Sequence, residues 1–190
     1  MGRLIYAFNC SLDGYINDAA GAFDWSMPDE ELHDHFMRLA WDAPTLLYGR
    51  RIYETMRVWE DMREDPGQPR AMRDYAEAWC AAQKIVYSTT LEDPGYPRTR
   101  VERTFDPAEV AALKAASPTD MSIAGAELAS HALRAGLVDE LQLAIAPVVV
   151  GGGTRMLPDG LRLDLELVEH RRFPQGALLV RYLVKDPQGG

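Results

Sequence analysis

The sequence predicts an α/β domain: a three-layer fold with a central, mostly parallel mixed sheet, an antiparallel C-terminal end and helices on both faces. Up to residue 140, short apolar runs alternate with segments whose apolar residues recur at helical spacing, a pattern typical of parallel sheets. In the last third, three strand-like segments follow one another across Gly- and Pro-rich turns with no helix between them. We therefore expect a single domain over residues 1–186 and a flexible tail at 187–190.

Strands are expected where apolar residues run together between turn residues. The first strand is followed by an Asp13-Gly14 turn and a short extension at Tyr15-Ile16. The expected strands cover residues 3–10, 45–48, 84–88, 100–104, 121–124, 141–150, 163–173 and 178–184.

Helices are expected where capping residues precede apolar residues at helical spacing. Pro28 and the three acids after it favour a helix over 28–41, because acidic groups suit the positive end of the helix dipole. Asp106 and Pro107 supply an N-cap and a first-position proline for a helix that begins there. The remaining helices are expected at 51–62, 71–82 and 127–135, the last closed by Gly136.

The composition is that of a globular domain that binds neither nucleic acid nor membranes. Of 190 residues, 47% are hydrophobic and 26% charged, enough for a sizeable core. The net charge of −9 and the absence of a basic run exclude a phosphate-backbone partner. No apolar run approaches the roughly 20 residues of a membrane span, and the N-terminal apolar run is too short for a signal peptide, so a cytoplasmic location is expected. Cys10 and Cys80 are far apart and the four histidines lack metal-ligand spacing, so we expect no metal.

A phosphate-binding turn is predicted at Gly49-Arg50-Arg51. These residues directly follow the apolar run 45–48 and open a helix. Arginines are unusual at the positive end of a helix, and they make sense there if an anion binds. A second turn of this kind is expected at Gly125, between the strand 121–124 and the next helix, although tight packing of that helix on its strand would also explain a glycine.

Five segments, taken in order, resemble the dihydrofolate reductase-like superfamily, and in particular its riboflavin-biosynthesis branch, the RibD C-terminal domain family. The resemblance implies the dihydrofolate reductase-like fold and an NADPH-dependent reductase. The substrate would be a pyrimidine- or pterin-like heterocycle, as in 5-amino-6-(5-phosphoribosylamino)uracil reductases. The segments are NCSLDGYI at 9–16, GRRIYE at 49–54, VYSTT at 86–90, IAGAEL at 123–128 and VDEL through APVVVGGG at 138–153.

The resemblance also assigns roles to residues. Ser88 and Thr89 would help Arg50 or Arg51 to hold the adenosine 2′-phosphate, the group that distinguishes NADPH from NADH. Asn9 would lie beneath the nicotinamide and Ile16 against its ribose. The expected cofactor-binding residues are Asn9, Ile16, Gly49, Arg50, Arg51, Ser88, Thr89, Ala124, Gly125, Ala126, Glu127 and Leu128. The residues expected to contact the substrate are Ser11, Trp25, Tyr48, Tyr53 and Gly152.

Two acids are candidate catalytic groups, each with a structural alternative. Dihydrofolate reductases use one acid at the start of the helix after a tryptophan-containing loop, and Glu30 or Asp29 matches that position. Acids in a first helical turn are also favoured by the dipole alone. Asp13 would either face the substrate or bond its own turn. Because no acid or base is indispensable, a nucleotide- or flavin-binding module without turnover stays open, as does a true dihydrofolate reductase.

A homodimer built through the C-terminal strands is the expected assembly. The run 141–150 is too uniformly apolar for an edge strand exposed to water, and a two-fold copy would cover it. The alternative is a strand buried between two others of its own chain.

Overall fold

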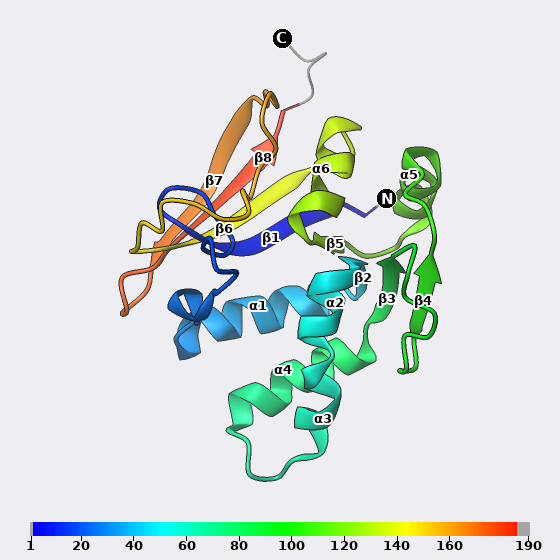
Figure 1. The fold of residues 1–190 in the computed structure, drawn as a ribbon, viewed down its shortest axis with the longest axis horizontal. Coiled ribbons are helices and arrows are strands. Elements are labelled where there is room, and N and C mark those ends of the chain that lie inside the picture. The colour runs from blue at the N-terminus through cyan, green and yellow to red at the C-terminus, as the bar shows by residue number, and fades with distance from the viewer. Residues whose placement is uncertain (1, 186–190) are drawn as a thin grey trace.

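A computed structural model describes residues 2–185, so the expected tail at 187–190 lies outside the described residues. The strands are β1 (Leu4–Ser11), β2 (Thr45–Gly49), β3 (Gln83–Tyr87), β4 (Thr99–Glu102), β5 (Met121–Ala124), β6 (Glu140–Ala146), β7 (Leu165–Arg172) and β8 (Leu178–Val184). They form one eight-stranded sheet in the order β4-β3-β2-β5-β1-β6-β8-β7 (Figure 1). Only β8, against β6 and β7, pairs antiparallel, which confirms the expected mixed sheet with an antiparallel C-terminal end.

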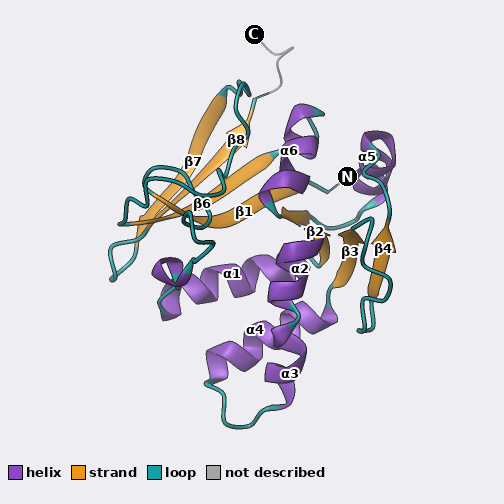
Figure 2. Ribbon diagram, viewed as in Figure 1, coloured by secondary structure: helices purple, strands orange, loops and turns teal. Residues whose placement is uncertain are grey.

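The helices lie on both faces of this sheet (Figure 2). Asp29 and Asp106 cap α1 and α5 by accepting backbone N–H bonds, as the sequence predicted for Asp106. The helices are η1 (Asp24–Ser26, a 3-10 turn), α1 (Glu30–Asp42), α2 (Arg50–Met56), α3 (Val58–Glu64), α4 (Arg70–Ala81), α5 (Pro107–Ala116) and α6 (Ala126–Arg134).

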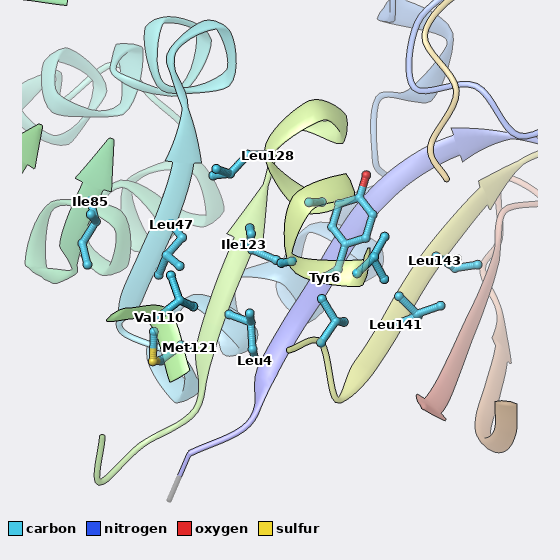
Figure 3. Close-up of a cluster of buried hydrophobic side chains, with 14 of the residues drawn as sticks. Leu4, Tyr6, Leu47, Ile85, Val110, Met121, Ile123, Leu128, Leu141 and Leu143 are labelled. Atoms are coloured by element: carbon cyan, nitrogen blue, oxygen red, sulfur yellow. The ribbon is translucent and has the colours of Figure 1, made fainter. Parts of the chain in front are cut away.

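The main core lies between the sheet and the helices α5 and α6 (Figure 3). Alternate residues of the central strands point to this side, because side chains alternate between the two faces of a sheet. The buried residues labelled there are Leu4, Tyr6, Leu47, Ile85, Val110, Met121, Ile123, Leu128, Leu141 and Leu143.

Two smaller clusters fill the opposite face, beneath α1, α2 and α4. Tyr53 of α2 and Trp79 of α4 pack on Leu46, Tyr48 and Val86 of β2 and β3. Further along the sheet, Leu32 of α1 packs with Ala144, Phe173, Ala177 and Leu179. The helix α1 is thereby fixed against the end of β6 and the turn of the β7–β8 hairpin.

The predicted helix 51–62 is in fact two helices. The first ends at Met56 and Arg57 joins it to α3. The break redirects the chain so that Trp59 packs against Tyr75 of α4, with ring centroids 4.6 Å apart. An apolar spacing continuous through 51–62 could not reveal this change of direction.

The strand predicted at 141–150 ends at Ala146, and it is not an edge. Pro147 has no backbone N–H to continue the ladder, and the chain leaves the sheet there. Because β6 lies between β1 and β8, its apolar residues are covered within the chain. The argument for a homodimer from an exposed apolar edge was therefore wrong. The homodimer itself stays a prediction, which light scattering would test against the 21.2 kDa monomer.

Candidate cofactor cleft and adjoining pocket

The central strand β1 loses its neighbour on one side part-way along its length. It pairs with β5 only at Leu4, Ile5 and Tyr6, whereas it pairs with β6 up to Ser11. Residues 7–9 are partly exposed, although they lie in the middle of a central strand. We call residues 7–11 the open edge of β1. Ligands of α/β sheets bind at such places, outside the carboxyl ends of diverging strands.

Two glycine turns stand at the carboxyl ends of the neighbouring strands β2 and β5. The register places Tyr48 beside Ala124, so that Gly49 and Gly125 follow at the same level. Gly125 has a φ of +100°, which side chains with a Cβ rarely adopt. A Cβ built on it would lie 3.4 Å from Cγ2 of Ile52 and 3.5 Å from the nitrogen of Gly49. The two glycine turns therefore lie against each other.

The helices that begin at these turns have no side-chain cap. Gly49 precedes α2 and Gly125 precedes α6, and neither supplies a side-chain acceptor, in contrast to Asp29 and Asp106. The first-turn N–H groups of a helix have no partner within the helix. At α6 these belong to Ala126, Glu127 and Leu128, of which Glu127 is exposed and Leu128 buries its side chain in the core.

The two arginines of the first turn differ in their contacts. Arg50 donates to both carboxylate oxygens of Glu54, at 3.0 and 3.2 Å. Arg51 is exposed and has no ion pair among the described residues. Arg51 is therefore the more available of the two for an incoming phosphate.

The hydroxyl residues after β3 lie at the same edge of the sheet, because Gly49 pairs with Tyr87. Ser88 is buried, and its Oγ accepts the N–H groups of Thr90 and Leu91, so it primarily caps its own turn. Thr89 is exposed beside it. The turn is further held by Arg103, which donates to the Ser88 carbonyl at 3.0 Å.

A cavity of about 120 Å³ lies on the α1 side of the open edge, and we call it the Asn9 pocket. Asn9 lines it, and the carbonyl oxygen Oδ1 of Asn9 is buried without a hydrogen-bond partner among the described residues. Trp25 also lines it, as predicted for a substrate contact. The full lining is Asn9, Trp25, Ser26, Met27, Leu32, Ala144, Ala146, Pro147, Gln175 and Ala177.

Four predicted site residues instead belong to a pair of interlocked loops, residues 11–17 and 148–156. The Asp13 carboxylate accepts the N–H groups of Val150 and Gly151, at 3.2 and 2.8 Å. The Ser11 hydroxyl and these N–H groups lower the pKa of Asp13. The N–H of Ile16 donates to Thr154, and the hydroxyl of Ser11 accepts from Tyr15. Gly152 lies in the second loop.

These contacts give Asp13 a structural role. Its carboxylate bonds a distant loop, and neither of the two alternatives expected from the sequence described that arrangement. Because Asp13 does not line the Asn9 pocket, the structure does not support its prediction as a catalytic acid.

Neither of the other candidate acids lines the pocket. Glu30 is exposed on the first turn of α1 and does not line the cavity. Asp29 accepts the N–H of Leu32 at 2.9 Å, and its second oxygen accepts the N–H of Gln175 at 3.4 Å. The helix-capping alternative therefore describes Asp29, and no carboxylate of residues 2–185 is among those that line the pocket.

Tyr48 and Tyr53, predicted as substrate contacts, lie in the core beneath α4. Tyr48 is 5% exposed, and its hydroxyl accepts from Nε1 of Trp79 at 3.2 Å. Tyr53 is fully buried and donates to the Pro94 carbonyl at 2.7 Å. Burial raises the pKa of both tyrosines. Neither hydroxyl is open to a ligand, so this part of the prediction was wrong.

Comparison with known proteins identifies the family to which this chain belongs. Residues 3–179 match the family of the RibD C-terminal domain. The chain belongs to that family. A relative from Bacillus subtilis (strain 168), the uncharacterized protein YyaP, is 28% identical over 182 residues, which are 95% of this chain and 94% of that protein.

Solved structures show the same dihydrofolate reductase-like fold of the RibD C-terminal domain. A putative riboflavin biosynthesis protein from Shewanella sp. PV-4 superposes with a TM-score of 0.76 at 21% identity, over 97% of this chain and 99% of that one. Acinetobacter baumannii RibD superposes with a TM-score of 0.69 at 18% identity, over 97% of this chain and 58% of that one. A deaminase/5-amino-6-(5-phosphoribosylamino)uracil reductase from Thermotoga maritima gives 0.66 at 16%, over 97% and 57%.

Several pocket residues of this RibD C-terminal domain carried no signal in the sequence. Gln175 reaches the pocket from the β7–β8 turn, and Ala144 and Ala146 line it because β6 follows β1 in the sheet. Only the strand order makes these residues neighbours of Asn9. Among the described residues there is no group of three side chains suited to hold a metal, and no helix long and apolar enough to cross a bilayer.

Proposed function

We propose that this chain is an NADPH-dependent reductase that acts on a pyrimidine- or pterin-like heterocycle. The observation that carries the proposal is the close approach of Gly49 and Gly125 beside Arg50 and Arg51, next to the open edge of β1. The RibD C-terminal family supports the reaction class. Asn9 belongs both to the open edge and to the pocket, so it joins the two halves of the site.

The residues present suit a dinucleotide phosphate. The φ of +100° at Gly125 favours glycine, so this turn carries no side chain between the backbone and a bound pyrophosphate. The uncapped first turns of α2 and α6 would offer N–H donors to it. Arg51, with Arg50 and the hydroxyl of exposed Thr89, would hold a 2′-phosphate by charge-assisted bonds.

NADPH, when bound, would supply a hydride. The chain would contribute binding and the orientation of the cofactor against the substrate. The Asn9 amide would fix one edge of the heterocycle, and Trp25 and Leu32 would cover its apolar surface. Because no titratable side chain lines the pocket, water would supply any proton that the reaction requires.

Titration with both nicotinamide cofactors tests the proposal. NADPH is expected to bind, and NADH to bind more weakly, because the 2′-phosphate adds the interactions with Arg50 and Arg51. Replacement of both arginines by Ala should weaken NADPH far more than NADH. No binding of either cofactor, or tighter binding of NADH, would contradict the proposal.

A second candidate is a binding module of the same fold that holds a nucleotide or flavin without turnover. The specific observation in its favour is the lack of any acid or base in the pocket lining. Bound NADPH that no pterin, pyrimidine or flavin oxidises would favour this function.

A true dihydrofolate reductase is disfavoured by the exposed position of Glu30. That function requires dihydrofolate-dependent NADPH oxidation that falls sharply in Glu30→Gln. We expect either no such oxidation or a rate that the substitution leaves unchanged.

A further inference from the structure

The Asn9 pocket contains no charge. Its polar groups are the side chains of Asn9, Ser26 and Gln175, and all its other lining residues are apolar. Two acids near the pocket are engaged with protein partners. Asp29 bonds backbone N–H groups, and Glu31 forms an ion pair with Arg171, whose guanidinium lies 4.7 Å from the Phe173 ring centroid.

A pocket of this kind disfavours an anion. Burial of an ionised group is costly unless a partner of opposite charge or several donors compensate for its lost hydration. A phosphate group entering here would meet no cationic side chain. The cavity of about 120 Å³ is also below the range of pockets for drug-sized ligands, about 300–1,000 Å³, so it suits a single small ring system.

The amide of Asn9 supplies the polar recognition. Its carbonyl oxygen is buried and has no partner among the described residues, and an unpaired buried acceptor is unfavourable. Because protein atoms enclose this oxygen, rotation of the amide would turn it toward a donor in the cavity. An asparagine amide offers one acceptor and two donors. This set matches the adjacent C=O and N–H of a cyclic amide, the edge that pyrimidinones and pteridinones present.

We propose that the pocket takes an uncharged, unphosphorylated cyclic amide and that Asn9 reads its C=O/N–H edge. This inference rests on the proposed function, since it names the substrate class of the same site. It separates this chain from the phosphoribosyl substrate in the name of the Thermotoga maritima protein.

Three probes that share one cyclic imide edge test the inference: uracil, uridine and uridine 5′-monophosphate. Titration calorimetry on the full chain without cofactor should show binding of uracil and uridine. It should show the monophosphate at least about tenfold weaker than uridine, a difference of about 1.4 kcal/mol. Monophosphate binding as tight as that of uridine, or no binding of either neutral probe, would overturn the inference.

Three variants sharpen the test. Gln175→Arg places a cation at an exposed residue of the pocket rim and should raise the affinity for the monophosphate, relative to the affinity for uracil in the same variant, about tenfold. Gln83→Arg is the matched control, because exposed Gln83 begins β3, which is separated from β1 by β2 and β5 in the sheet, and it should alter neither affinity. Asn9→Leu, of similar size without the amide, should weaken uracil about tenfold, with a thermal melt to check folding. If that variant does not fold, the Gln175 and Gln83 pair still decides.

A separate NADPH titration distinguishes a failure of the proposed reductase function from a failure of the substrate class proposed for the pocket. If NADPH binds and the neutral probes do not, the substrate class is wrong and the reductase proposal stands. If NADPH does not bind and the probe order is as expected, the reductase proposal fails and the pocket assignment stands.

Discussion

The Cβ position of Gly125 lies against the backbone of Gly49: a methyl group on Gly125 would lie 3.5 Å from the nitrogen of Gly49 and 3.7 Å from its Cα. The two turns belong to strands that are adjacent in the sheet and 76 positions apart in the chain, from Gly49 to Gly125. Any side chain on Gly125 therefore acts on both walls of the proposed cofactor cleft at once.

Gly125→Ala is expected to reduce the free energy of unfolding by about 1–3 kcal/mol, the usual cost of a disallowed backbone conformation. It should also weaken NADPH binding, because relief of the strain at a φ of +100° shifts the backbone that precedes α6. Gly136→Ala is the matched control, since its φ of +67° imposes strain but nothing lies within 4 Å of its Cβ position. Thermal melts and NADPH titrations of both variants measure the two effects. Wild-type NADPH affinity in Gly125→Ala would contradict the assignment.

Arg51→Ala is expected to weaken NADPH about tenfold or more, because charge-assisted phosphate bonds contribute roughly 1.5–3 kcal/mol each. Arg50→Ala should have a smaller effect, since Arg50 already bonds Glu54. NADH affinity should change little in either variant. Arg100→Ala removes an exposed arginine that pairs with Glu102, and it controls for loss of charge alone. Equal losses in all three arginine variants would argue against a specific phosphate contact.

Asp13→Asn is expected to lower the melting temperature at neutral pH. Each Asp13 oxygen accepts a different backbone N–H, so an amide in its place opposes one N–H group with another. The lowered folded-state pKa of Asp13 means that its stabilisation is present above the unfolded pKa of about 3.9 and is lost as pH falls through the folded value. The difference between variant and wild type should therefore shrink in acid.

Asp18→Asn is the matched control for that prediction. Asp18 uses one oxygen, Oδ1, to accept the N–H groups of Ala20 and Ala22, and asparagine keeps that acceptor. A melting temperature lowered as much by Asp18→Asn as by Asp13→Asn would mean that the two-oxygen contact is unimportant.

His33→Phe is expected to flatten the loss of stability in mild acid. His33 is 7% exposed, neither ring nitrogen has a hydrogen-bond partner among the described residues, and burial lowers its pKa. Because the unfolded chain takes up this proton below a pH of about 6.5, the folded state loses stability as pH falls from there toward the lower folded pKa.

Denaturant unfolding of wild type and His33→Phe between neutral pH and mild acid measures this effect. The pKa of His35 is lowered in the same direction by burial, and it is present in both proteins, so it does not affect the comparison. Exposed His170→Gln serves as the control and should leave the pH dependence unchanged. Parallel pH curves for wild type and His33→Phe would show that His33 is not responsible.

The sequence predicted the glycine turns because each one interrupts an apolar run just before a helix, a local pattern. It could not predict that they touch, since strand order is not a local property. The substrate contacts predicted for Tyr48 and Tyr53 failed for a similar reason. Both flank the Gly49 turn in sequence, but strand alternation points Tyr48 away from the cleft and toward Trp79, and the α2 helix turns Tyr53 the same way. Gln175 was missed because a hairpin turn far along the chain carries it to Asn9.

The position of β1 has a consequence for the order in which the chain folds. Its two neighbours in the sheet are late in the sequence, with Leu4 beside Met121 and Ile5 beside Glu140. During synthesis, β1 must therefore wait until residues 121–140 have left the ribosome before it finds both neighbours. Contacts of such long sequence separation slow folding, because the intervening chain must first be closed into a loop. Until then the apolar segment 4–8 is unpaired, so nascent chains shorter than about 150 residues should depend on chaperones that hold exposed strands.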